Sequence, residues 1–313
     1  MKSTPKPSWS SAAVLITLVA AISTVPCRAP VYAVGVGPAS IPSYYSHEYF
    51  NVTSPSAYPS GISGYANPAV YGILPGADLS FASAVTGNNT KAYDDYATVL
   101  SYTNMGFGLV HERVEFPETG AIAAVNDWRI GIARTRRSTT LGLGFGFSSL
   151  DDDKAGRSNI VQVGLVQRFG RSVTVGACGN FATEENNQTG LFDAAYRPFR
   201  DYSLTVFADT ELRKGMSASD VDWSVGARVE FLRGIHASAR YFSDDMFSVM
   251  LAVSLGAGWR ISGNGRFDTD GENISTTTEI RWGFREPGLF QNFDPEEERP
   301  PDTRWDQPPY AGQ

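Results

Sequence analysis

Apolar and small residues alternate along the stretch from Thr139 to Ser149. Four large apolar side chains take one set of positions and small residues the other: Leu141, Leu143, Phe145 and Phe147 against Gly142, Gly144, Gly146 and Ser148. In an extended strand, such alternation places the large residues on one face and almost bare backbone on the other. A strand of a soluble sheet usually turns polar residues to water. The pattern instead favours a membrane barrel whose lumen side stays uncrowded.

The same period-two alternation recurs from Ala77 onward, in segments of about ten residues, which is the length a tilted strand needs to cross a bilayer. Val221 to Phe231 and Phe247 to Leu255 are clear examples. About fourteen segments are found, with a range of roughly 12 to 16: 78–85, 94–103, 105–115, 125–135, 139–149, 158–169, 172–183, 190–198, 202–210, 221–231, 235–243, 246–256, 257–267 and 275–284. We therefore predict an all-β fold, an antiparallel transmembrane β-barrel of about fourteen strands.

The connections between these segments alternate between short and long. TN, RRS, GR and LRG are short, whereas GNNTKAYDD, LDDDKAGR and ELRKGMSASD are long, with the tight SDD after Tyr241 as the exception. Outer-membrane barrels have short periplasmic turns and longer external loops, and an even strand number leaves both barrel ends in the periplasm. Within GFGLVHERVEF the apolar face switches between Leu109 and Val110, which predicts a bulge or an irregular strand there.

The first residues predict export. Lys2 and Lys6 precede an apolar run from Ala12 to Ile22, and small or modest residues lead to Ala33, so residues 1–33 read as a cleavable signal peptide. The run is shorter than the roughly 20 residues of a spanning helix, and no later stretch reaches that length without charge. Lipid attachment at Cys27 fits poorly because a proline precedes it, and a lone Cys178 would then form no internal disulfide.

Composition agrees with a barrel. The chain has 31 Gly, 14 Tyr, 18 Phe and 6 Trp in 313 residues, and its net charge of -7 argues against a nucleic-acid partner. A secreted β-sandwich would also show short alternating strands. However, its other face would meet water, where Gly, Ser and Ala repeated over many strands would be unusual. We therefore expect the protein to lie in the bacterial outer membrane, in contact with outer-membrane lipid.

The strip SGISGYANPAVYGILPGADLSF precedes the first strand and contains Asn67, Pro68 and Ala69. This N-P-A, followed by an alternating strand, resembles the long-chain fatty-acid transporter (FadL-like) type of outer-membrane barrel and its PorV-like relatives. The resemblance implies that residues 34–76 fold into the lumen as a plug or hatch and that residues 77–284 form the barrel. Asn-Pro also fits a plain turn.

The end of the chain departs from a simple barrel. Phe284 closes the last predicted strand and fits the terminal aromatic residue that the barrel-assembly machinery recognises. Residues 285–313, with PEEERPP and DQPPY, are acidic and rich in proline, which predicts a disordered periplasmic tail. Trp305 and Tyr310 amid these prolines suit docking on a periplasmic protein partner.

No stretch carries an enzyme motif. The three histidines, His47, His111 and His236, stand in no metal-ligand spacing, so we predict no catalytic residue, no metal and no cofactor. An outer-membrane protease or lipase would need a nucleophile or base at the strand rim, which we cannot assemble. Asp151 to Asp153 and the segment FDTDGEN fit solvated acidic loops better than calcium sites.

Inward polar residues are the remaining candidates for function. They are Asp127, Arg129, Arg168, Arg228, Glu230, Arg240, Arg260 and Arg281, which we expect to set the field of the lumen and its selectivity. Two functions follow. In one, the barrel is a channel or transporter for small or hydrophobic molecules. In the other, it is a plugged anchor or scaffold for a periplasmic partner or secretion complex. Inward Arg and Glu fit both, because ion pairs also fill a closed lumen.

Overall fold

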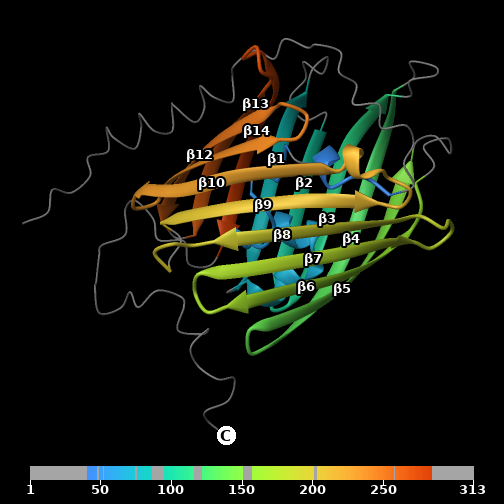
Figure 1. Cartoon of the computed structure of the whole chain (residues 1–313), viewed down its shortest axis with the longest axis horizontal. Helices are drawn as coiled ribbons and strands as arrows, with labels where there is room; N and C mark the ends of the chain where they lie inside the picture. The colour runs from blue at the N-terminus through green and yellow to red at the C-terminus, as the bar shows by residue number, and fades with distance from the viewer. Residues whose placement is uncertain are drawn as a thin grey trace, which may run out of the picture.

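Fourteen antiparallel strands close into a barrel in the computed structural model (Figure 1), with each strand paired to its neighbours in sequence and β1 paired to β14. The structure describes residues 41–47, 49–51, 53–74, 76–86, 95–115, 122–150, 157–200, 203–256 and 258–283. The strands are β1 (Asp78–Thr86), β2 (Asp95–Tyr102), β3 (Met105–Glu115), β4 (Ile122–Arg136), β5 (Thr139–Leu150), β6 (Ile160–Phe169), β7 (Val173–Ala182), β8 (Gln188–Tyr196), β9 (Leu204–Arg213), β10 (Asp222–Leu232), β11 (Ile235–Phe242), β12 (Phe247–Gly256), β13 (Trp259–Phe267) and β14 (Asn273–Gly283). The predicted all-β barrel is confirmed.

The two ends of the barrel differ in the length of their connections. At one end, which we call the short-turn end, the connections are 103–104, 137–138, 170–172, 197–203, 233–234 and 257–258. The opposite, long-loop end has 87–94, 116–121, 151–159, 183–187, 214–221, 243–246 and 268–272. Thr103 and Asn104 have φ of 37° and 70°, the left-handed pair that a two-residue hairpin turn requires. The predicted alternation holds except at 197–203, a connection of seven residues at the short-turn end, and at 243–246, a connection of four residues at the long-loop end.

Large apolar side chains cover much of the outward face of the barrel. Leu143 is 56% exposed and Phe145 is 45% exposed, and similar values recur on most strands. Around β11 to β13, by contrast, the outward Ile235, Leu251 and Val253 form a buried cluster. A belt of exposed apolar residues of this kind suits contact with lipid. In the described part of the chain, no helix has the length and apolarity to cross a membrane.

The described residues between 41 and 74, here called the plug segment, lie inside the barrel. They contain η1 (Tyr45–His47), α2 (Gly61–Ala66) and η2 (Pro68–Ile73). The hydroxyl of Ser60 caps α2 by accepting from the backbone N–H of Ser63 at 3.1 Å. The segment begins beside strand residues next to the long-loop end and reaches the short-turn end, where the Thr135 hydroxyl donates to the Gly72 carbonyl at 2.6 Å.

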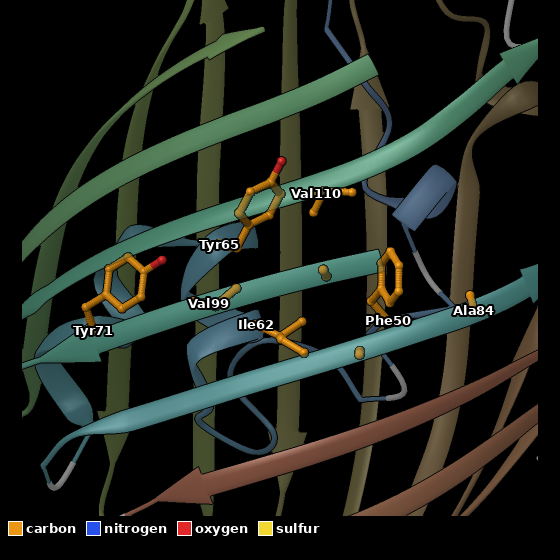
Figure 2. Close-up of a cluster of buried hydrophobic side chains, with 9 residues drawn as sticks. Phe50, Ile62, Tyr65, Tyr71, Ala84, Val99 and Val110 are labelled. Atoms are coloured by element: carbon orange, nitrogen blue, oxygen red, sulfur yellow. The ribbon is translucent and has the colours of Figure 1, made fainter. Parts of the chain in front are cut away.

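One hydrophobic cluster joins the plug segment to the barrel wall (Figure 2). Phe50, Ile62, Tyr65 and Tyr71 of the plug segment pack against Ala82, Ala84, Ala97, Val99 and Val110 of β1 to β3. The predicted bulge at Leu109 and Val110 is wrong, because β3 pairs with β2 and β4 in continuous register. Val110 is an inward residue that is apolar because the plug segment covers it.

Several predicted segments fall outside the described residues. These are the signal peptide of residues 1–33, the residues 34–40 at the start of the predicted plug, Phe284 and the tail 285–313. Their limits therefore stay predictions.

Candidate functional site

The bare face of β3 to β6 is the surface on which the plug segment packs. A side chain at Gly142 would overlap the backbone of Pro68 and Ala69, and one at Gly164 would overlap the Asn67 amide. Gly106 and Gly131 would meet the ring of Tyr71, and Gly108 would meet that of Tyr65. These glycines therefore allow the backbone and rings of the plug segment to approach the wall closely.

The Asn67-Pro68-Ala69 motif lies at the centre of this contact. Asn67 is fully buried; its side-chain oxygen accepts from the Ala69 N–H at 3.1 Å, which starts η2. Its side-chain nitrogen donates to the Leu165 carbonyl at 3.3 Å and the Ala177 carbonyl at 3.2 Å. The motif is thus both a local turn, as Asn-Pro alone would predict, and a link to β6 and β7.

Acidic side chains on β8 and β9 hold the first half of the plug segment. Asp193 accepts from the Ser56 N–H at 2.7 Å. Glu211 accepts from the Ser43 hydroxyl at 2.5 Å and from the Tyr44 N–H at 3.2 Å. Asp209 accepts from the Tyr45 hydroxyl at 2.5 Å. The carboxylates therefore satisfy buried donors of the plug segment, which lowers the cost of burying them.

Buried arginines hold the carbonyl groups of the same segment. Arg197 donates to the carbonyls of Ser56 and Ala57 at 3.1 and 2.9 Å. Arg129 donates to the Tyr65 carbonyl at 2.9 Å and lies 4.1 Å from the centre of its ring. Arg240 donates to the Asn51 carbonyl and to Asp209, the latter at 2.7 Å.

Three further arginines surround the ring of Tyr58 towards the short-turn end. The guanidinium carbon of Arg228 lies 3.3 Å from the ring centre, that of Arg260 5.3 Å and that of Arg281 5.4 Å. Arg260 pairs with Glu279 at 3.0 Å, and Arg281 pairs with Asp78. A cavity of about 30 Å³ lies beside Tyr58, Arg228 and Arg260. That volume admits water but no larger solute.

The eight predicted lumen residues are thus divided by what they contact. Arg129, Arg228, Arg240, Arg260 and Arg281 contact the plug segment. Asp127 accepts from the Ser148 hydroxyl through its side chain and from the Tyr65 hydroxyl of the plug segment, at 3.3 Å, through its backbone carbonyl. Glu230 accepts from the Gly234 N–H at 2.8 Å, and Arg168 is half-buried near the end of β6. Their effect on selectivity stays a prediction. Sequence reasoning missed Asp193, Arg197, Asp209 and Glu211, although the inward parity of Asp193, Asp209 and Glu211 was available.

A compact group of metal-ligating side chains lies where the plug segment meets β3 and β4. His47, Glu112 and Asp127 are all buried, and one ligand atom from each lies within 4.8 Å of the others. Arg157 contacts Glu112 and lies 3.8 Å from Asp127. The sequence alone does not predict this group, because its members are far apart in the chain and match no motif.

Burial also changes the ionisation of the plug tyrosines. Removal from water raises the pKa of Tyr44, Tyr65 and Tyr71 well above the usual value, because the charged phenolate is disfavoured there. The same cause raises the pKa of Tyr45. The hydroxyls of Tyr45 and Tyr65 donate to Asp209 and to the Asp127 carbonyl, whereas that of Tyr44 accepts from Arg240.

Comparison with solved structures gives the same architecture. The CymD monoaromatic hydrocarbon channel aligns with a TM-score of 0.54 at 12% identity, covering 82% of this chain and 99% of that one. The KdgM porin aligns with a TM-score of 0.37 at 9% identity over 66% of this chain and 99% of the porin. A mutant porin of Rhodopseudomonas blastica aligns with a TM-score of 0.41 at 10% identity over 66% and 98%. No family model and no curated protein sequence matches. The feature shared with the hydrocarbon channel is the fold.

Proposed function

We propose that this chain is a gated channel of the bacterial outer membrane, closed by the plug segment and opened when that segment moves. The exposed apolar belt and the fold support a position in the outer membrane, with the short turns towards the periplasm. The plug segment contacts wall residues from β1 to β14, so passage of a solute requires its displacement.

The observation that carries the proposal is the set of charged side chains beneath the plug segment. Arg228, Arg260 and Arg281 are 3%, 5% and 5% exposed. A lumen that stayed closed would be filled at least as well by apolar residues, because burying charges costs desolvation energy that ion pairs often only offset. Buried charges on a lumen wall are therefore better explained by a state in which the wall is hydrated.

The two walls suggest the class of solute. The wall of β1 to β6 offers glycines and small apolar residues beside the charged Asp78, Glu112, Asp127 and Arg129, whereas that of β10 to β14 offers a cluster of arginines. A passage that combines an apolar surface with a cluster of arginines suits small amphipathic anions, whose apolar body and carboxylate would each meet a matching surface. The aligned hydrocarbon channel and the FadL-like resemblance both agree with small hydrophobic solutes. The scaffold alternative depends on residues 285–313, which lie outside the described part.

Proteoliposome swelling with the full chain tests this function. Benzoate should enter faster than a neutral polar sugar of similar size, and Arg228→Glu should reduce the benzoate rate while leaving the sugar rate much less affected. Arg171→Glu is the control, because it changes the net charge by the same amount at a residue that is exposed in the 170–172 turn. Equal rates for both solutes, or equal effects of both variants, would refute the proposed solute class. Absence of swelling with any solute, in the intact chain and also in a folded variant lacking residues 41–74, would refute the channel.

A further inference from the structure

We propose that His47, Glu112 and Asp127 form a binding site for a divalent transition-metal ion that fastens the plug segment to the barrel wall. Each residue belongs to a different element: His47 to η1, Glu112 to β3 and Asp127 to β4. A metal ion bound by all three would therefore link the plug segment to two adjacent strands.

The geometry fits such an ion. Ligand atoms around tetrahedral zinc lie about 3.3 Å apart, given bonds of roughly 2.0–2.1 Å. His47 Nε2 and Glu112 Oε2 are 3.2 Å apart, and the three ligand atoms lie within 4.8 Å of one another. Small side-chain movements would bring the third ligand to bonding distance. One imidazole and two carboxylates suit zinc and its neighbours in the first transition row, with water as a fourth ligand.

Two of the ligand atoms make no hydrogen bond within the described residues. These are His47 Nε2 and Asp127 Oδ2, and their residues are each 3% exposed. His47 Nε2 lies 3.2 Å from the Glu112 carboxylate as an ion-pair contact, and Asp127 Oδ2 lies 3.8 Å from the Arg157 guanidinium. Buried polar atoms normally have hydrogen-bond partners, so these two atoms, which lie close together, can serve as metal ligands.

Charge also favours a divalent ion. Glu112 and Asp127 bring two negative charges into a buried place where Arg157 supplies one positive charge. A divalent ion would neutralise both carboxylates and would compete with the Arg157 guanidinium for Glu112. Removal of Arg157, the buried ion-pair partner of Glu112, should therefore improve metal binding.

Zinc titration of the purified full chain in detergent micelles tests the site, with zinc per chain measured by elemental analysis and affinity by calorimetry. Wild type should bind one Zn²⁺. His47→Gln and Asp127→Asn should weaken binding by at least about tenfold, and Arg157→Ala should tighten it. His236→Gln is the matched control, since His236 is a buried inward histidine outside the ligand group. Heat-modifiable mobility on gels checks that every variant is folded.

Bound zinc should also slow proteolysis of the plug segment in wild type and not in His47→Gln. The proposal is overturned if wild type binds no stoichiometric zinc, if His47→Gln binds it unchanged, or if His236→Gln loses it. It is also overturned if Arg157→Ala loosens the plug segment without tightening zinc binding, because the group is then an ion-pair contact alone. These outcomes are independent of solute transport, so either proposal can fail without the other.

Discussion

Gly142→Ala should release the plug segment while leaving the barrel intact. The methyl group added on the inward face of β5 would overlap the backbone of Pro68 and would lie 2.7 Å from the Cα of Ala69. Backbone cannot turn away as a flexible side chain does, so the segment must shift or detach. Overpacking of this kind costs about 1–3 kcal/mol. Because each 1.4 kcal/mol is a factor of ten, the detached population should rise by about 5- to 150-fold.

Limited proteolysis of the folded barrel measures this population, since cleavage follows the open fraction when opening and closing are fast. Cleavage within residues 41–74 should accelerate by the same factor. Gly144→Ala is the matched control: it lies two residues along the same strand and face, but its methyl group would meet the Gln162 side chain, with Oε1 at 2.9 Å, instead of the plug segment. Unchanged cleavage in Gly142→Ala, or equal acceleration in Gly144→Ala, would refute the close contact.

Three further predictions concern the membrane face, the Asn67 link and alkaline pH. Leu143→Arg should destabilise the barrel in vesicles by about 2–4 kcal/mol in urea unfolding, and Leu141→Arg, nearer the short-turn end, should cost less; equal costs would contradict the depth assignment. Asn67→Ala should speed proteolysis of the plug segment by removing hydrogen bonds to β6 and β7, worth about 0.5–1.5 kcal/mol each, whereas Asn264→Ala, which removes one contact of 3.5 Å, should do less. Burial raises the pKa of Tyr44, Tyr65 and Tyr71, so the contribution of these side chains to binding of the plug segment is complete below about pH 10 and is lost as pH rises through the raised pKa values. Tyrosinate absorbance should therefore appear together with release of the plug segment. Full tyrosinate absorbance before the segment is released would contradict the burial of these side chains.

The strands could be predicted from the sequence because each carries its own signal. Period-two alternation assigned the outward Trp223 and Val225 and the inward Ser224 and Arg228 correctly. No strand limit differs from the prediction by more than three residues. Such local patterns suffice because nearly every strand has the same two faces, an exposed apolar face outside and a face towards the lumen inside.

The interior of the barrel could not be predicted in the same way. The sequence suggested an uncrowded lumen lined by polar residues, and this assumption produced the mistaken bulge at Val110. Gly142 of β5 instead faces the backbone of Pro68 and Ala69, which lie more than seventy residues earlier in the chain. Contacts between such distant segments produce no periodic pattern in the sequence. For the same reason the group of His47, Glu112 and Asp127 could not be predicted from the sequence.

Conductance in planar bilayers tests the central claim that the plug segment closes the lumen. The intact chain should stay closed with at most brief openings, whereas a variant lacking residues 41–74 should show steady ion conductance, provided its heat-modifiable mobility shows a folded barrel. The intact chain supplemented with zinc provides a second closed reference. A folded deletion variant that conducts no more than the intact chain would contradict the account, because the lumen would then be closed by the barrel itself.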